Sequence, residues 1–381
     1  MAVKKRRASK PHASKKQKKP ARAVRKAAPV SKHDDVAEII ERLGSDVRRL
    51  SGKTILLTGG AGFLGRHITA VVKRLNQGIL SKPITLISVD NFITGDPRAH
   101  RNGSDPNILQ VWADVAHPLP IREDVDFIMH AAGVASPVHY MRHPIETIES
   151  AVHGTKNLLE LARKNPKLEG FLFFSSSEIY GDPSHDAVPT PETYHGYVSS
   201  VGPRACYDES KRLGETLATI YHDRFGVPAK IVRPFNVFGP GMGHDDRRAI
   251  AAFAYEALNG RPIPVHGDGN QTRTFCYITD AINGFFRVLL KGKNGEAYNI
   301  GNERNEIPMR KLAEMYRDII PSAKHSLIDY PETYPAGEPQ RRCPDLRKAR
   351  EHLGYRARVD LKEGLERFIS WARKQKAYRD A

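Results

Sequence analysis

The chain has 381 residues, 40% of them hydrophobic, which is enough for one large α/β domain or for two to three smaller domains. No apolar run approaches the roughly 20 residues that span a bilayer, and the N-terminus lacks a secretory signal, so we expect no membrane span. The three cysteines are scattered, which excludes a disulfide framework and metal-ligand spacing and favours a cytoplasmic protein without a metal site.

The positive charge of the chain is concentrated at its N-terminus. The formal net charge is +17, and residues 1–33 contain thirteen Lys and Arg residues and no Asp or Glu. The other 47 basic residues nearly balance the 43 acidic ones. Because residues 1–33 have few large apolar side chains, we expect a disordered basic tail. It either solvates the protein or binds nucleic acid or another polyanion.

The segments after the tail alternate between two kinds of apolar pattern. Residues 34–50 have apolar side chains at helical spacing, which predicts a short N-terminal helix. Short apolar runs then alternate with helical segments, and the runs that predict strands are 54–58, 84–89, 108–112, 127–131, 171–175 and 229–233. Continuous apolar runs are typical of parallel strands buried on both faces, so we predict an α/β fold with a doubly wound parallel sheet.

The composition changes after Pro234, where Gly- and Pro-rich loops are interspersed with helical segments. Closing helices are predicted at 309–319, 346–353 and 361–374. We therefore predict a tail (1–33), an N-terminal helix (34–51), a Rossmann domain (52–235) and a smaller substrate lobe (236–378), part of which returns to the Rossmann domain.

A glycine-rich turn points to a cofactor. Gly59, Gly62 and Gly65 follow an apolar strand and open a helix, a layout that holds a pyrophosphate on backbone N–H groups. Asp90 ends the next strand, where a carboxylate accepts hydrogen bonds from both hydroxyls of an adenosine ribose and repels a 2′-phosphate. The sequence therefore predicts NAD rather than NADP, with the qualification that the nearby Arg98 can accommodate a phosphate.

Tyr207 and Lys211 are four residues apart on a predicted helix, so their side chains lie one above the other. The ammonium would lower the pKa of the phenol and let Tyr207 act as a general base. Ser176 lies in a run of serines at the carboxyl end of a predicted strand and is a candidate hydrogen-bond donor to the reacting hydroxyl. With the dinucleotide turn, these residues predict hydride transfer at an alcohol.

These motifs lie in a chain that, over residues 52–375, resembles the extended short-chain dehydrogenase/reductases that act on nucleotide sugars, and most of all the UDP-glucuronate decarboxylases. The stretches that carry the resemblance are TGGAGFLG (58–65), VDNF (89–92), SSSEIYGD (175–182), GPRACYDESK (202–211), FNVFG (235–239), QTRTF (271–275) and PDL (344–346). The long GPRACYDESK segment is the most specific of them.

The resemblance implies a reaction cycle. Tyr207 takes the proton of the sugar 4-hydroxyl while a hydride passes from C4 to NAD. The 4-keto acid then loses carbon dioxide, and NADH returns the hydride to give UDP-xylose. The resemblance also implies a homodimer formed by two helices of each subunit, around residues 151–163 and 207–224.

The resemblance assigns roles to further residues. Ser177, Glu178 and Arg273 shape the decarboxylation, and Arg273 pairs with the uronate carboxylate. Asn236 and Arg342 bind the diphosphate of the UDP-sugar, and Lys211 holds the nicotinamide ribose. The other expected cofactor-binding residues are Phe63, Leu64, Asn91, Asp114, Val115 and Ala131.

Two alternatives stay open. A 4-epimerase acting on a UDP-uronate or a related sugar is the first, because residues 131–136, Ala151, Gly241 and His266 depart from the decarboxylase pattern. A non-catalytic protein that senses a dinucleotide or binds nucleic acid is the second. The presence of Ser176, Tyr207 and Lys211 disfavours it. Dehydration is disfavoured because Ser177 stands where 4,6-dehydratases carry an Asp.

Overall fold

The computed structural model describes residues 1, 33–95, 105–121, 124–304, 306–330 and 339–379. The basic tail, except for its first and last residues, and Arg98 lie outside the described residues. The chain divides into two units, residues 1–34 and residues 35–381, and the second contains all the helices and strands given below.

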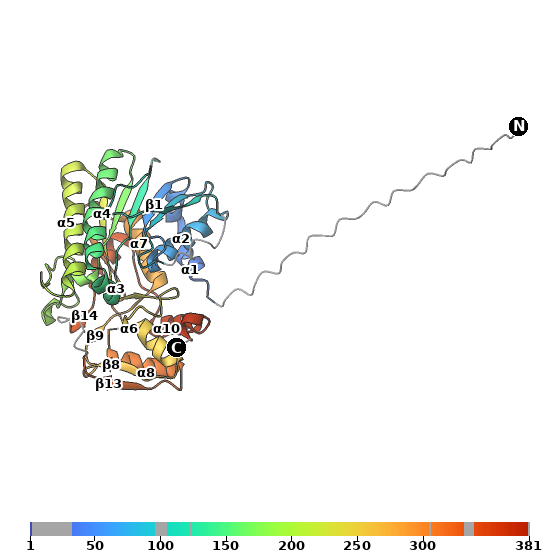
Figure 1. The fold of residues 1–381 in the computed structure, drawn as a ribbon. Coiled ribbons are helices and arrows are strands. Elements are labelled where there is room, and N and C mark those ends of the chain that lie inside the picture. Colours follow the sequence, from blue (N-terminus) through green and yellow to red (C-terminus); the bar gives the residue numbers. More distant parts are fainter. Residues whose placement is uncertain (2–32, 96–104, 122–123, 305, 331–338, 380–381) are drawn as a thin grey trace. The chain divides into compact units, whose positions relative to one another are not determined.

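A seven-stranded parallel sheet forms the centre of residues 35–381, with the strand order β11-β6-β5-β4-β1-β2-β3 (Figure 1). Its strands are β1 (Thr54–Thr58), β2 (Thr85–Asp90), β3 (Ile108–Trp112), β4 (Phe127–His130), β5 (Gly170–Phe174), β6 (Ala229–Pro234) and β11 (Ala297–Ile300). The six predicted strands are confirmed to within one residue at each end, and β11 was not predicted. From β1 the chain adds β2 and β3 on one side, and it then adds β4, β5 and β6 on the other side. Ligands bind at such a switch point, here between β1 and β4, in open α/β sheets.

Helices cover both faces of this sheet. Alternate side chains of β1 point in opposite directions, so Ile55 and Leu57 belong to one buried cluster and Leu56 to the other. The first cluster includes side chains of α1 (Asp35–Leu43), α2 (Phe63–Asn76) and α7 (Ile278–Lys291). The second includes side chains of α4 (Pro144–Lys164) and α5 (Ala205–Phe225). This arrangement confirms the doubly wound fold (Figure 1).

The N-terminal helix is shorter than predicted. α1 ends at Leu43, and a 3₁₀ helix, η1 (Gly44–Leu50), follows because Gly44 adopts a φ of 58°. The helix is fixed to the C-terminal part of the chain by ion pairs. Arg42 lies 2.7 Å from the fully buried Asp280, and Asp35 accepts a hydrogen bond from the Tyr277 hydroxyl at 2.8 Å.

The C-terminal part of the chain adds helices and three small sheets. The helices are α6 (Ala249–Leu258), α8 (Met309–Ile319), α9 (Arg347–Leu353) and α10 (Leu361–Ala372). The small sheets pair β7 (Val237–Phe238) with β10 (Cys276–Tyr277), β8 (Ile263–His266) with β13 (His325–Ile328), and β9 (Thr272–Arg273) with β12 (Ile307–Pro308) and β14 (Arg341–Arg342). Short elements elsewhere are α3 (Pro137–Arg142), η3 (Ser177–Tyr180), η4 (His185–Ala187) and η5 (Lys376–Tyr378).

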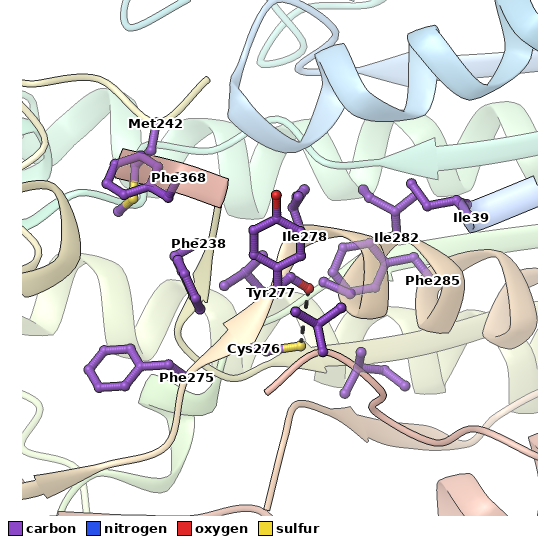
Figure 2. Close-up of a cluster of buried hydrophobic side chains, with 14 of the residues drawn as sticks. Ile39, Phe238, Met242, Phe275, Cys276, Tyr277, Ile278, Ile282, Phe285 and Phe368 are labelled. Atoms are coloured by element: carbon purple, nitrogen blue, oxygen red, sulfur yellow. Dashed lines mark hydrogen bonds between the residues drawn. The ribbon is translucent and has the colours of Figure 1, made fainter. Parts of the chain in front are cut away.

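One apolar cluster joins the C-terminal segments to the sheet. Figure 2 shows Ile39 of α1 near the α7 residues Ile282 and Phe285, with Phe238 and Phe368 on the other side of Tyr277. Because this cluster is continuous, residues 35–381 form one compact unit. The predicted boundary at residue 235 stays a prediction. In the described part of the chain, no helix combines the length and the apolar character needed to cross a membrane.

Candidate active site

The glycine-rich turn is closely packed. Gly59, at a φ of 75°, follows β1, and a Cβ added to it would lie 2.7 Å from the carbonyl oxygen of Ala131. A Cβ added to Gly65 would lie 2.1 Å from the carbonyl oxygen of Gly59. A larger residue at position 59 would therefore push the turn away from Ala131, and one at position 65 would separate it from α2, whose N-cap is Gly62. The turn brings backbone N–H groups and the positive end of the helix dipole to the carboxyl end of the sheet, which suits a phosphate.

Asp90, at the end of β2, is fixed beside this turn. Its carboxylate accepts a hydrogen bond from the backbone N–H of Ala61 at 2.9 Å and another from Phe92 at 2.7 Å. A carboxylate has about four acceptor positions, and these two bonds from the described residues leave two for ribose hydroxyls. Next to it, the amide of Asn91 donates to Asp114 at 2.9 Å. The turn and the carboxylate together fit the adenosine and pyrophosphate of a dinucleotide.

A cavity of about 1090 Å³ extends from the turn to the C-terminal part of the chain. The structure places almost all the sequence-predicted site residues along it. These lining residues are Gly59, Gly62, Phe63, Leu64, Gly65, Asp90, Asn91, Val115, Ala131, Ser176, Ser177, Glu178, Tyr207, Lys211, Asn236, Arg273 and Arg342. Asp114 is the exception: within the described part of the chain it holds Asn91 and does not line the cavity.

Tyr207 is buried at the start of α5, and its ring stacks on that of Tyr140, with the centroids 5.3 Å apart and the planes at 12°. Burial raises the pKa of the Tyr207 phenol to about 12, and a hydrogen bond with Ser176 opposes the rise. The sequence-based expectation of a lowered pKa is therefore wrong for this structure. Desolvation is the largest cause of the raised pKa, the charges of Glu178 and Asp208 add to it, and that of Arg248 opposes it.

Lys211 lies one turn further along α5. Its ammonium donates to the carbonyl oxygen of Phe174 at 2.8 Å and lies 5.9 Å from the centre of the Tyr207 ring. Burial lowers the pKa of Lys211 to about 8, so the amine holds its proton weakly. The helix thus brings a phenol and a lysine that exchanges its proton near neutral pH to the same end of the cavity.

Glu178, in η3, is the centre of a cluster of ion pairs. Arg342 donates to both carboxylate oxygens, at 2.5 and 2.9 Å, and Arg204 donates to one of them. Burial opposes ionisation of Glu178, but Arg342, Arg204 and Arg273 together hold the pKa of this carboxyl below its usual range. The cluster is therefore charged, with more guanidinium groups than carboxylates, and suits an anionic ligand.

The two predicted arginines both line the cavity, and their expected roles stay predictions. Arg342, expected at the phosphates, is the direct partner of Glu178, and 164 residues separate them in the sequence. Arg273 is 5% exposed and donates to the backbone carbonyl of Thr272 at 2.8 Å, so it is not a surface residue. Asn236 has a φ of 38° and donates its amide to the Thr274 carbonyl at 2.9 Å. This bond fixes the direction of its side chain.

Sequence reasoning missed three residues of this region. Tyr140 stacks on Tyr207, Arg204 pairs with Glu178, and Arg248 lines the same cavity. Arg204 could have been found, because it stands three residues before Tyr207 on the same helical turn. Tyr140 and Arg248 come from distant segments that the sequence alone does not bring together. In the described part of the chain, no group of His, Cys, Asp or Glu side chains could hold a metal ion.

Comparisons with known proteins assign the chain to a family. The family model of the NAD dependent epimerase/dehydratase family matches residues 55–301. UDP-glucuronic acid decarboxylase 2 of Arabidopsis thaliana is 39% identical over 337 residues, which cover 86% of this chain and 71% of that protein. UDP-glucuronic acid decarboxylase 1 of Danio rerio is 40% identical over 322 residues, which cover 84% of this chain and 72% of the relative.

Solved structures share the fold over most of the chain. The dTDP-glucose 4,6-dehydratase of Streptomyces venezuelae, solved with NAD and TYD bound, is 25% identical with a TM-score of 0.74, and the match covers 86% of this chain and 99% of that one. The UDP-glucose 4-epimerase of Thermotoga maritima, solved with UDP-glucose, is 25% identical with a TM-score of 0.71, over 84% and 99% of the two chains. By its sequence match and its fold, this chain is a member of the NAD dependent epimerase/dehydratase family.

Proposed function

We propose that this chain decarboxylates UDP-glucuronate to UDP-xylose, with NAD as its resident cofactor. The names of the relatives at about 40% identity support the reaction. The observation that carries the proposal is the cluster of Glu178 with Arg342 and Arg204, which lines the same cavity as Tyr207. A neutral sugar would not need such an excess of guanidinium groups, but a sugar carboxylate would pair with it.

The turn and Asp90 are the residues that would hold NAD. The backbone of Gly59, Gly62 and Gly65 would cradle the pyrophosphate, and Asp90 would bind the adenosine ribose. Lys211 would hold the nicotinamide ribose. A bound NAD supplies a two-electron oxidant that takes hydrogen from the sugar C4 and returns it at the end, so the cycle has no net redox change.

Tyr207 and Lys211 would move the proton of the sugar 4-hydroxyl. Tyr207 is the group that accepts the proton, and Ser176 holds the phenol by its hydrogen bond. Because burial raises the phenol pKa to about 12, Tyr207 needs a second group to take the proton onward. Lys211, with its pKa of about 8 and its place one turn away, is the group we assign to this relay.

The arginine cluster would act on the second step. A 4-keto uronate is a β-keto acid, so the electron pair of its C5–carboxylate bond moves toward the ketone as carbon dioxide leaves. Arg342 and Arg204 would bind the carboxylate, and Glu178 would keep them aligned while offsetting part of their charge. Ser177 contributes a hydroxyl beside Glu178. Arg273 and Asn236 line the same cavity and would contact the diphosphate or the sugar.

A homodimer is part of the proposal. α4 and α5 pack against each other on one face of the sheet, and their outward sides keep apolar residues such as Ile148, Leu213 and Ile220 at 40–45% exposure. A second copy of the same helix pair would cover them. Sedimentation of the wild type and of Leu213→Glu tests this, and a monomeric wild type would contradict it. We also propose that the basic tail, residues 1–33, binds a polyanion.

The reaction is tested with purified full-length protein, UDP-glucuronate and NAD, followed by mass spectrometry of the sugar nucleotide. We expect the mass to fall by one carbon dioxide without accumulation of NADH, and Tyr207→Phe to abolish the change. An unchanged mass with a new stereoisomer would instead identify a 4-epimerase. If the wild type leaves UDP-glucuronate unchanged, the proposed function is wrong.

A further inference from the structure

A second buried carboxylate lies beside the Glu178 cluster and has no part in the mechanism above. Asp208 follows Tyr207 in α5 and is 5% exposed. One of its oxygens lies 3.5 Å from the Nε of Arg204. The other oxygen is buried and has no hydrogen-bond partner among the residues that the structure describes. A carboxylate so poorly solvated is costly to keep charged, so its presence next to the cluster needs an explanation.

Arg204 connects Asp208 to Glu178. The guanidinium is a rigid planar fork, and its Nε faces Asp208 while its Nη2 donates to Glu178. The Arg204 side chain is 13% exposed, so water screens these charges weakly. A change of charge on Asp208 therefore alters both the alignment of Arg204 and the field at the position of the uronate carboxylate.

We propose that Asp208 is a positioning residue for decarboxylation, which holds Arg204 between two carboxylates and limits the positive charge around the carboxylate that leaves. The inference rests on the proposed function, because it needs a uronate substrate. Arg204 is a third guanidinium in the neighbourhood of Glu178, together with Arg342 and Arg273. With Glu178 and Asp208 both charged, the three guanidinium groups exceed the carboxylates by one positive charge. With Asp208 neutral, the excess is two positive charges.

The excess of charge affects binding and chemistry in opposite directions. Additional positive charge binds the substrate carboxylate more tightly and therefore lowers KM. The same charge slows the release of carbon dioxide, because the carboxylate loses its negative charge to the ketone in the transition state. Neutral Asp208 should therefore lower KM and kcat together, whereas a purely structural defect would not lower KM.

Asp208 can change its charge near neutral pH. Burial, together with the charge of Glu178, raises the pKa of Asp208 to about 7, although Arg204 and Arg342 oppose the rise. The titratable and charged groups that face Asp208 are Glu178 from η3, Arg342 from β14, Tyr140 from α3, and Arg204, Cys206 and Tyr207 from its own helix. Below this pKa Asp208 is neutral, and above it Asp208 carries its charge.

The experiment measures kcat and KM for UDP-glucuronate from about pH 5.5 to about pH 9 with the NAD-loaded wild type and Asp208→Asn. Loss of the Lys211 proton, with its pKa of about 8, should raise kcat in both proteins. We therefore compare the ratio of the wild-type kcat to the Asp208→Asn kcat, and we expect this ratio to rise through about pH 7 and then level off. Asp208→Asn should have a kcat about tenfold below that of the wild type above about pH 7, a lower KM, and values that approach those of the wild type at low pH.

Glu209→Gln is the matched control. It removes the same charge from the next residue of α5, whose side chain is 40% exposed, and it should keep the wild-type pH profile. A ratio of the two kcat values that does not rise through about pH 7, or an unchanged KM and kcat in Asp208→Asn, would overturn the inference. If Asp208→Asn does not fold, the wild-type KM decides, because a KM that does not rise as the pH passes about 7 also overturns the inference. Failure of the wild type to decarboxylate UDP-glucuronate would instead refute the proposed function.

Discussion

Replacing Gly65 by Ala tests the cofactor assignment most directly. The added Cβ would lie 2.1 Å from the carbonyl oxygen of Gly59 and 2.7 Å from the Cα of Gly60. Both neighbours are backbone atoms, which cannot rotate away. Ordinary contact therefore requires the turn and α2 to separate by about 1 Å. Overpacking of this kind costs about 1–3 kcal/mol. If the strain is expressed at the turn, the affinity for NAD falls by about 5- to 150-fold.

The assay is calorimetric titration of NAD into cofactor-free wild type and Gly65→Ala, with unfolding by denaturant measured in parallel. Ala70→Gly is the control, because it changes one methyl group of the same helix. It should cost about 1 kcal/mol of stability from helix propensity without changing the Kd for NAD. If the wild type binds NAD and Gly65→Ala binds it equally tightly, the close packing of the turn is not needed for the cofactor. If the wild type does not bind NAD, the cofactor assignment itself is wrong.

Three further changes test the relay, the N-terminal helix and a buried histidine. Lys211→Met removes the amine of the proton relay and should lower kcat by about a hundredfold or more in the mass-spectrometric assay, with normal unfolding. Arg42→Met leaves the buried Asp280 without its counter-charge and should lower the unfolding free energy by about 3–5 kcal/mol in urea, whereas the exposed Glu41→Gln should not. Burial lowers the pKa of His130 to about 3, so below its ordinary value of 6.5 the unfolded chain binds a proton that the folded protein excludes. The contribution of His130 to the unfolding free energy is therefore fully present above pH 6.5 and is lost as the pH decreases toward 3. His130→Phe should flatten this slope of the unfolding free energy, measured in urea, between about pH 7 and about pH 5.

The sheet was predictable because its strands are determined by nearby residues. Short continuous apolar runs placed six strands, and the alternation of Ile55, Leu56 and Leu57 between two buried clusters agrees with a sheet covered on both faces. β11 was missed because it is four residues long and includes Asn299, a polar side chain that is fully buried. The N-terminal helix was predicted too long because Gly44 lies in the middle of an apolar pattern, and a pattern does not report the backbone angle of one glycine.

The sequence by itself determined the turn of Gly59, Gly62 and Gly65 and the helical pair of Tyr207 and Lys211, because spacing along one chain segment is a local property. The tertiary structure alone decided the charges of the site. Glu178 meets Arg342 across 164 residues of sequence, and that contact exists only after the C-terminal strands have packed. The pKa values of Tyr207 and Lys211 also depend on the tertiary structure. Burial raises that of Tyr207 and lowers that of Lys211, since the free energy of a charge depends on how much water the whole fold removes from it.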